Sequence, residues 1–394
     1  MGKKILADKT LLIITPYYPD EKNKDVQGIF VKDQINEIKK HFKKIYVIAF
    51  VLNSLKISKK NRLYKNYSYD NVSVFYLRSL YFPLEFSGGI RIDNRHTKLL
   101  RFIKKKDLKF DLVHAHFSWP SGFIASKIKD QLNIPYILTV HENFTWFKSE
   151  LKNDYKEYRS AWTKADRILR VNMQDYKHLM SYNESVEFFP NAVSSRFKPL
   201  DKQLVREELE LKQKEFIFAL GIHVKRKGFQ DLIIAMKDIK QEKPQLKCYI
   251  GGKGPKTKFL KRLIRKHDLS NHVELLGFLS NEMYVKWLNA CDLFIFPSHS
   301  ESFGVTVVEA LTCGKPVVAT YNNASEFILT ENYLGLLVNS RSPTDLAMGI
   351  IKALNINWER KKILDFATRF LPAKINEKLL HYYQSILENT QNKK

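Results

Sequence analysis

The chain has 394 residues, of which 44% are hydrophobic and 27% are charged, and its formal net charge is +25. A single hydrophobic core stops growing near about 250–300 residues, so this length indicates two globular domains. The longest apolar runs are far shorter than the roughly 20 residues of a membrane-spanning helix, which argues against an integral membrane protein. We also expect no secretory signal, because no basic start and apolar core precede a cleavage site.

The first predicted strand covers residues 11–15 and ends at Pro16, where a long polar loop begins. That loop reaches Gly28, and a helix is predicted from residue 29 to about residue 42. A glycine between a strand and a helix lets the backbone approach a ligand closely, because no Cβ stands in the way. The loop lacks a G-x-G-x-x-G pattern, which counts against a nicotinamide-dependent dehydrogenase.

The positive excess of the first half of the chain lies between Lys39 and Lys109. This block also holds an aromatic-rich loop over residues 80–86 and a predicted basic helix over residues 92–106. Basic residues beside exposed aromatic side chains suit an anionic membrane surface, where each charge contributes on the order of 1 kcal/mol. A solvated basic face is the alternative, and nucleic acid is disfavoured because no nucleic-acid-binding motif accompanies the charge.

Strands and helices alternate through the rest of the first half. The strands are predicted over residues 45–50, 72–77, 111–116, 136–140, 167–171 and 186–189, and further helices over residues 120–131 and 173–181. This alternation predicts a parallel sheet that is covered by helices on both faces.

Two of these strands end in histidine: one at His114 and His116, the other at His141. The two-residue period of a strand puts His114 and His116 on the same side. Ligands bind at the carboxyl edge of such sheets, so these titratable groups are candidates for a site, although a structural hydrogen bond is the alternative for each. We expect no metal, because no carboxylate or third histidine stands at ligand spacing.

A second domain is predicted to begin with a strand over residues 216–220, after an irregular linker over residues 189–199. The loop after this strand carries Gly221, Gly228 and three cations: Lys225, Arg226 and Lys227. Glycines allow close backbone approach and cations supply charge, so the loop predicts a diphosphate cradle, with solvated surface cations as the alternative. The cysteines Cys248, Cys291 and Cys313 lack metal spacing, and buried thiols in a reducing compartment are expected.

Residues 294–320 read FIFPSHSESFGVTVVEALTCGKPVVAT and predict a strand, a helix and a second strand. The serines expected to cap a helix that begins near Phe303 or Gly304 are Ser298, Ser300 and Ser302. The start of that helix faces the carboxyl edge of the sheet, where free N–H groups suit phosphate. Glu301 and Glu309 can accept hydrogen bonds from neutral hydroxyls, so the stretch predicts a sugar nucleotide as ligand.

The string from Glu301 to Gly304, followed by Glu309 and the segment GKPVVAT, resembles the E-x7-E signature of family 4 retaining glycosyltransferases of the GT-B fold. The resemblance covers roughly residues 10 to 385. It implies an α/β fold of two Rossmann-like parallel-sheet domains facing across a cleft. We expect an acceptor-binding domain over residues 1–192, a nucleotide-sugar-binding domain over residues 200–372, and a helix over residues 373–394 that returns to the first domain.

The resemblance also implies roles for individual residues. Those with expected catalytic roles are His116, Lys227 and Glu301. Those expected to bind the donor are Gly28, Lys227, Glu301, Phe303, Gly304, Val305 and Glu309. Relatives carry an arginine where this chain has Ile222. We therefore expect Lys225 or Arg226 to supply the missing cation.

The activity implied is transfer of a hexosyl sugar, with retained configuration, from a nucleotide sugar to an acceptor hydroxyl, with UDP favoured over GDP. The acceptor is expected to be a lipid-linked saccharide in cell-surface polysaccharide synthesis, and the protein to be cytoplasmic and peripheral on the inner face of the plasma membrane. Neither a metal nor a cofactor is expected. The alternatives are a transferase that makes a soluble glycoside and a non-catalytic sugar-nucleotide-binding subunit.

Overall fold

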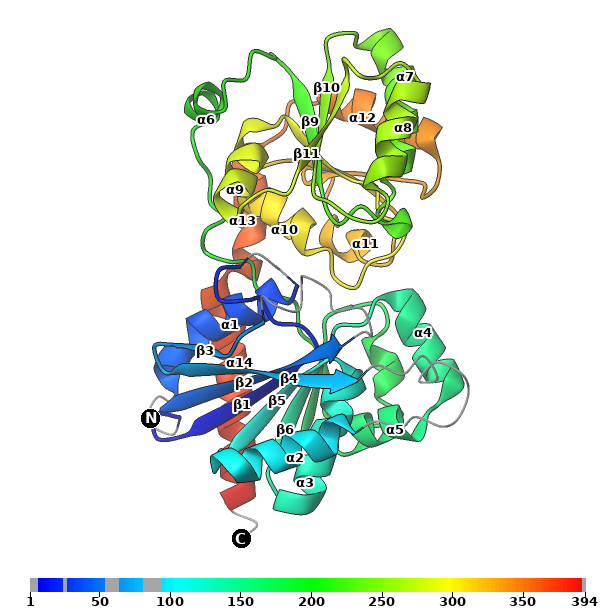
Figure 1. The fold of residues 1–394 in the computed structure, drawn as a ribbon. Coiled ribbons are helices and arrows are strands. Elements are labelled where there is room, and N and C mark those ends of the chain that lie inside the picture. The colour runs from blue at the N-terminus through cyan, green and yellow to red at the C-terminus, as the bar shows by residue number, and fades with distance from the viewer. Residues whose placement is uncertain (1–5, 24–26, 54–63, 81–93, 392–394) are drawn as a thin grey trace. The chain divides into compact units, whose positions relative to one another are not determined.

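The computed structural model describes residues 6–23, 27–53, 64–80 and 94–391 (Figure 1). The chain forms two compact units, one of residues 1–192 with 372–394 and the other of residues 193–371. Apart from Leu80, the aromatic-rich loop predicted over residues 80–86 lies outside the described residues.

The first unit is built on an eight-stranded sheet. Its strands are β1 Thr10–Thr15, β2 Lys44–Asn53, β3 Tyr67–Tyr69, β4 Val72–Leu80, β5 Leu112–His116, β6 Tyr136–Val140, β7 Arg167–Arg170 and β8 Val186–Phe188. They lie in the order β3-β4-β2-β1-β5-β6-β7-β8. All neighbours are parallel except β3 and β4, so the prediction of a wholly parallel sheet is wrong at this edge.

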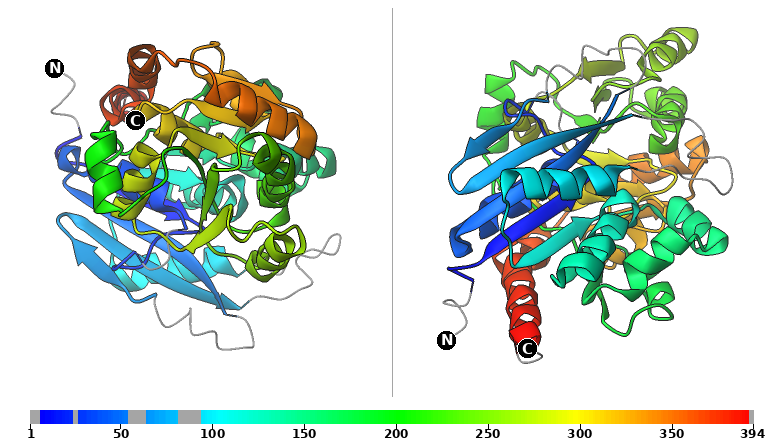
Figure 2. Two further views of the ribbon diagram at one scale, coloured as in Figure 1. Left: turned by 90° about the horizontal axis from the view of Figure 1, so that it is seen from above. Right: turned by 60° about the horizontal axis from the view of Figure 1, so that its bottom comes forward.

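Helices cover both faces of this sheet (Figure 2). The helices of this unit are α1 Ile29–Ile38, α2 Arg95–Lys106, α3 Phe123–Leu132, α4 Phe144–Asn153, α5 Lys156–Thr163 and α14 Pro372–Gln391. Leu11 and Ile13 of β1 face the core formed with α1 and α14, whereas Leu12 and Ile14 face the core formed with α2 to α5. This alternation follows from the two-residue period of a strand. The helix predicted over residues 173–181 is only a 3₁₀ turn, Tyr176–Leu179.

The second unit is built on a six-stranded sheet whose neighbours are all parallel. Its strands are β9 Phe216–Leu220, β10 Lys247–Gly251, β11 Val273–Gly277, β12 Leu293–Phe296, β13 Val317–Thr320 and β14 Gly335–Val338, in the order β11-β10-β9-β12-β13-β14. The helices are α6 Lys202–Glu208, α7 Phe229–Glu242, α8 Thr257–Lys266, α9 Asn281–Ala290, α10 Val305–Thr312, α11 Ser325–Ile328, α12 Pro343–Leu354 and α13 Arg360–Ala367.

Both units confirm the predicted α/β class with Rossmann-like sheets. In the second unit the direction of strand succession reverses between β9 and β12, and in the first it reverses between β1 and β5. Ligands of open α/β sheets bind outside the carboxyl ends of the strands at such a reversal. The loops after these four strands are therefore the places to look for a site. No helix in the described part of the chain is both long and apolar enough to cross a membrane.

Candidate functional site

The loops after β9 and β12 pack directly on each other. Gly228 has a φ of 67°, and a Cβ at this position would lie 1.8 Å from the backbone oxygen of Pro297. Only glycine fits both the left-handed conformation and this close approach. The contact brings the loop of three cations against the loop that carries Glu301.

Glu301 is the centre of a charged cluster. It is buried, and its Oε1 lies 2.7 Å from Lys227 Nζ and 3.0 Å from Arg226 Nη1. Burial alone would raise the pKa of the Glu301 carboxyl, but the charges of Lys227 and Arg226 outweigh it and hold that pKa below its ordinary value. Glu301 is therefore ionised at neutral pH, and its carboxylate can accept hydrogen bonds from hydroxyl groups.

The two cations expected to replace the family's arginine lie in different surroundings. Arg226 donates from Nη1 to the backbone oxygen of Ser300 at 3.0 Å as well as to Glu301. Lys225 is exposed, and within the described part of the chain its side chain forms no ion pair. Ile222 is 50% exposed. Of the two candidates, the structure brings Arg226 to the carboxylate.

Lys227 is held more tightly than Arg226. Its side chain is 14% exposed, against 45% for Arg226, and its Nζ lies 5.4 Å from the centre of the Phe296 ring. The aromatic face attracts a cation, so the ring and Glu301 together fix the position of the ammonium group.

Helix α10 begins at Val305, next to the predicted start near Phe303 or Gly304. Its N-cap is Gly304 in a left-handed conformation with φ 81°, and no side chain caps it, so the predicted serine cap is wrong. The side chain of Phe303 is buried against Phe327 and Phe370, which leaves only its backbone for a ligand. By helix geometry the first amides of α10 have no acceptor within the helix, so they can bind an anion.

Glu309, the second glutamate of the signature, lies in the second turn of α10 and is half-buried. Its Oε2 accepts a hydrogen bond of 2.7 Å from the hydroxyl of Tyr284. Burial raises the pKa of that hydroxyl, so Tyr284 stays a hydrogen-bond donor. Sequence analysis missed Tyr284, which lies 25 residues away on α9.

The loop after β13 holds the backbone of Glu301. The Glu301 amide donates to the backbone oxygen of Asn322 at 3.2 Å. The carboxylate of Glu326 accepts from the amides of Asn322 and Asn323 at 3.2 and 3.0 Å. Glu326 therefore shapes the loop that supports Glu301.

In the first unit, Gly28 lies at the N-cap of α1 with a φ of 75°. A Cβ there would lie 2.2 Å from the backbone oxygen of Tyr17, so the loop after β1 folds back closely on itself. Any side chain at this position would force the two backbone segments apart.

His116 lies at the carboxyl end of β5 in a row of three stacked imidazole rings. Its ring centre is 4.2 Å from that of His114 and 5.2 Å from that of His141, and its Nδ1 shares a hydrogen bond of 3.0 Å with His141 Nε2. Burial lowers the pKa of His116 to about 3, so the ring is neutral at physiological pH. Among the described residues no partner reaches its buried Nε2.

The inner end of this row is fixed by two hydroxyl groups. His114 Nδ1 lies 2.6 Å from the hydroxyl of Tyr383 on α14, and His114 Nε2 lies 2.7 Å from that of Thr139. The three rings lie in a stack and do not converge on one point. Within the described ranges, no group of three or more His, Cys, Asp or Glu residues could hold a metal ion.

A buried polar network beside this row was also missed. Glu142 accepts from the amide of Ser118 at 2.6 Å. The fully buried Arg170 pairs with Asp175 through two bonds of 2.7 Å and donates to the backbone oxygen of Glu142 at 2.8 Å. This network fixes the loops after β5 and β6, and its only signal in the sequence was Arg170, one of the two arginines that flank the apolar pair of β7.

Comparison with known proteins agrees with this architecture. The family model "Glycosyl transferases group 1" matches residues 201–386, and the model "Glycosyltransferase Family 4" matches residues 58–196. An uncharacterized glycosyltransferase of Methanocaldococcus jannaschii is 31% identical over 255 residues, which are 64% of this chain and 68% of that protein. The putative teichuronic acid biosynthesis glycosyltransferase TuaC of Bacillus subtilis is 27% identical over 403 residues, 96% of this chain and 99% of that protein.

Solved structures share the fold over nearly the whole chain. Sucrose-phosphate synthase from Thermosynechococcus elongatus superposes with a TM-score of 0.75 at 19% identity, covering 97% of this chain and all of that one. HepE from Anabaena, solved in complex with UDP-glucose, superposes with a TM-score of 0.72 at 18% identity, covering 96% and 100%. The chain thus belongs to glycosyltransferase family 4 and has the GT-B fold.

Proposed function

We propose that this glycosyltransferase moves a hexosyl sugar from a nucleotide sugar, with UDP favoured over GDP, to a hydroxyl of a lipid-linked saccharide acceptor. The configuration of the sugar is retained and no metal is required. The observation that carries this proposal is the cluster of Glu301, Lys227 and Arg226 at the strand-order reversal, beside the start of α10.

The chemistry follows from the charges in this cluster. The leaving nucleoside diphosphate gains negative charge as the glycosidic bond breaks, and preorganised cations and amides stabilise that charge. We assign this role to Lys227 and to the amides of Phe303, Gly304 and Val305. When a diphosphate binds, Lys227 would form an ion pair with it in place of the ion pair with Glu301. The Glu301 carboxylate could then accept hydrogen bonds from the hydroxyls of the sugar and orient them.

Glu309 is assigned to the ribose hydroxyls, because one of its oxygens is already fixed by Tyr284. A contact with the donor sugar is assigned to His116, whose neutral Nε2 is free to share a hydrogen bond. Gly28 is assigned to a close approach of backbone to the donor.

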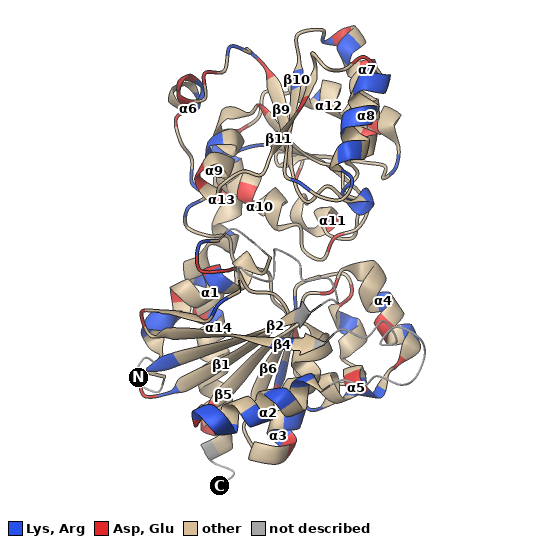
Figure 3. Ribbon diagram, in the orientation of Figure 1, with Lys and Arg blue, Asp and Glu red and all other residues tan. Residues whose placement is uncertain are grey.

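Two observations support a saccharide acceptor at a membrane. TuaC, whose printed name refers to teichuronic acid biosynthesis, aligns with 96% of this chain. Helix α2 presents a basic surface (Figure 3), with Lys104, Lys105 and Lys106 exposed in its last turn. Such a surface suits the anionic headgroups of a membrane on its cytoplasmic side.

A transferase that makes a soluble glycoside is the second candidate. Mannosylfructose-phosphate synthase of Agrobacterium fabrum is 25% identical over 293 residues, 64% of this chain and 63% of that protein. A non-catalytic sugar-nucleotide-binding subunit is the third, because Ile222 stands where relatives carry arginine.

A panel of UDP-, GDP- and ADP-sugars, scored for hydrolysis by the purified protein, tests the proposed activity. We expect one donor to be hydrolysed, and Glu301→Gln to abolish this, while the control Glu242→Gln at the exposed end of α7 leaves it unchanged. A non-catalytic subunit would bind a donor without hydrolysing it.

Cosedimentation with vesicles of anionic lipid tests the membrane surface. Replacing Lys104, Lys105 and Lys106 together by glutamine should weaken binding by about 3 kcal/mol, at about 1 kcal/mol per charge. The matched control replaces three exposed cations of α8, namely Lys258, Lys261 and Arg262, and should weaken binding less. If the wild-type protein does not bind anionic vesicles and glycosylates only soluble acceptors, the result favours a transferase that makes a soluble glycoside.

A further inference from the structure

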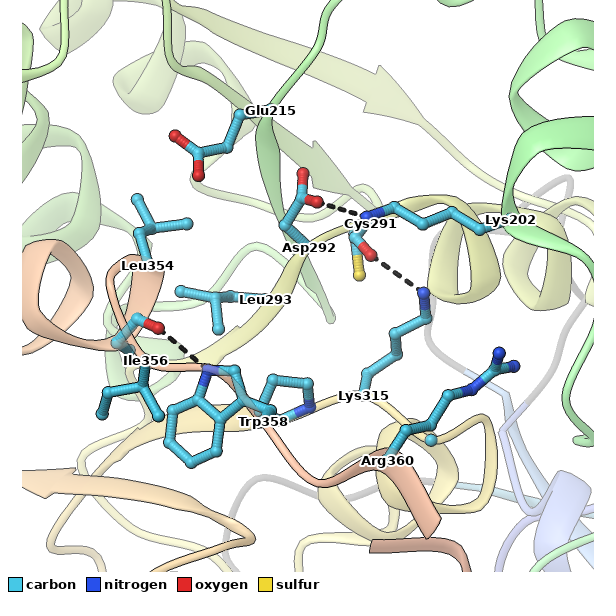
Figure 4. Close-up of a pocket in the computed structure, with 13 residues that line it drawn as sticks. Lys202, Glu215, Cys291, Asp292, Leu293, Lys315, Leu354, Ile356, Trp358 and Arg360 are labelled. Carbon is cyan, nitrogen blue, oxygen red and sulfur yellow. Dashed lines mark hydrogen bonds and ion pairs between the residues drawn. The ribbon is translucent and has the colours of Figure 1, made fainter.

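A pocket of about 270 Å³ lies in the second unit at the amino ends of β12 and β13 (Figure 4). Asp292 directly precedes β12, and Lys315 stands two residues before β13. Parallel strands place this edge opposite the one that carries Glu301. The pocket is thus separate from the proposed donor site, although α10 begins at the donor site and ends beside Gly314.

Lys315 is a buried cation in the wall of this pocket. It is 6% exposed, and its Nζ donates to the backbone oxygen of Cys291 at 3.0 Å. No carboxylate of the described residues lies within ion-pair distance of it. An ammonium group has three donors, so at least two remain for a ligand. Burial lowers the pKa of Lys315 to about 8, which reflects a charge without sufficient compensation.

Two further cations line the same side of the pocket. In Figure 4 the side chains of Lys202 and Arg360 lie near that of Lys315, across from Leu354 and Glu215. Arg360 is exposed and donates from Nη2 to the backbone oxygen of Leu200 at 3.3 Å, and in the described part of the chain it forms no ion pair.

Gly314 makes room for Arg360. It has a φ of 72°, and a Cβ there would lie 2.9 Å from Arg360 Nε and 3.0 Å from its Cγ. The guanidinium group therefore runs over a backbone position that has no side chain, directly beside Lys315.

The carboxylates of the pocket already have partners. Asp292 pairs with Lys202, accepts from Arg206 Nη2 at 2.8 Å and accepts from the amide of Phe216 at 2.7 Å. Glu215 Oε2 lies 3.4 Å from Lys243 Nζ. These contacts leave Lys315 and Arg360 as the uncompensated charges of the pocket.

We propose that this pocket binds a small oxyanion of the phosphate class, held by Lys315 and Arg360 with Lys202 at its rim. The planar fork of arginine matches two oxygens of a phosphate, and the lysine supplies a point charge. The volume lies below the roughly 300 Å³ at which pockets for drug-sized ligands begin, so the ligand is inorganic phosphate or a small phosphate ester.

A purely structural role for Lys315 is the competing explanation. Cys291 is the C-cap of α9, and a cation at a helix C-terminus stabilises the helix dipole. That role needs no ligand and predicts no saturable binding of phosphate.

Isothermal titration with inorganic phosphate, at ionic strength held constant with sodium chloride, tests the proposal. We expect saturable binding to the wild type, and Lys315→Met or Arg360→Gln should each weaken it about tenfold or more. Lys227→Met, which changes the proposed donor site, should leave this binding intact. Arg360 is exposed, so Arg360→Gln should fold even if Lys315→Met does not, and it still tests whether phosphate binding is weakened.

Three outcomes would overturn the proposal. The first is no saturable binding to the wild type, which leaves Lys315 its structural role. The second is equal phosphate affinity in the wild type, Lys315→Met and Arg360→Gln, which means adventitious binding elsewhere. The third is loss of binding in Lys227→Met alone, which assigns the phosphate to the donor site.

Discussion

The carboxyl edges of the two sheets share a topology but differ in charge. At the edge of the first unit, burial keeps the ring of His116 neutral within a stack of three histidines. At the edge of the second unit, Glu301 is also buried but stays charged between Lys227 and Arg226.

The difference shows how a buried polar group is tolerated in each place. A buried charge is costly unless it is paired, and a neutral ring needs only hydrogen bonds. The first edge therefore offers a fixed neutral hydrogen-bonding group. The second offers two cations paired with one carboxylate, and in the proposed function an incoming diphosphate replaces that carboxylate as their partner. Changes to one edge should alter donor binding and turnover in ways that changes to the other do not.

Removing Lys227 from the charged cluster of the second unit should have the largest effect. Lys227→Met leaves Glu301 with Arg226 alone and takes away the ammonium group to which we assign the charge of the departing diphosphate. We expect kcat/KM for the donor to fall about 10²- to 10³-fold, as for loss of one transition-state donor. Steady-state kinetics checks this, and Lys225→Met on the same loop should change kcat/KM little. Equal losses in the two variants would mean a diffuse electrostatic effect.

Removing the second glutamate should mainly weaken binding of the donor. Glu309→Gln loses a charged acceptor for the ribose, a change of about 1.5–3 kcal/mol, so KM for the donor should rise roughly ten- to a hundredfold. Tyr284→Phe, which removes the hydroxyl on Glu309, should raise KM in the same direction but less. An unchanged KM in Glu309→Gln would remove this residue from the donor site.

The three buried histidines at the carboxyl edge of the first sheet should make the stability of the first unit dependent on pH. Burial lowers the pKa of each of the three histidines, His116 to about 3, whereas the unfolded chain titrates near 6.5. The unfolded state thus binds more protons below about pH 6.5, so stability falls there by up to about 1.4 kcal/mol per pH unit for each histidine. Urea unfolding between pH 5 and 8 measures this slope. His116→Gln should flatten it, and an identical slope in that variant would contradict the account.

The smallest effect is expected where the histidine row meets α14. Tyr383→Phe removes the hydroxyl that fixes His114, on which the ring of His116 stacks. We expect kcat to fall less than about tenfold, for the loss of one hydrogen bond of about 0.5–1.5 kcal/mol, with KM for the donor unchanged. Tyr382→Phe is the matched control, because that hydroxyl bonds Glu187 instead. Equal kcat values in the two variants would leave Tyr383 a purely structural role.

Much of the fold could be predicted because the buried strands are apolar runs bounded by glycine and proline. The edge strand β3 was missed because three residues, Tyr67–Tyr69, are too few to show a period. Helices α4 and α5 were missed although Asn143 caps the first of them by accepting from the amide of Trp146. That cap lies two residues after His141, which sequence analysis considered only as a candidate site residue.

In the candidate site, residue types could be predicted but contacts could not. The string around Glu301 and the cations of the β9 loop were identified, yet Arg226 and Glu301 meet across 75 residues of sequence. The choice of Arg226 over Lys225 depends on the contact of Gly228 with Pro297, which only the fold reveals. The glycine cap of α10 likewise follows from a left-handed turn that flanking serines do not signal.

We propose that the loops after β9 and β12 bind the diphosphate of the donor. Calorimetric affinities for the nucleoside diphosphate that the donor panel identifies, and for its monophosphate, test this binding. We expect the wild type to prefer the diphosphate by about tenfold or more, and Lys227→Met to lose most of this preference. An undiminished preference in Lys227→Met would show that the outer phosphate binds elsewhere.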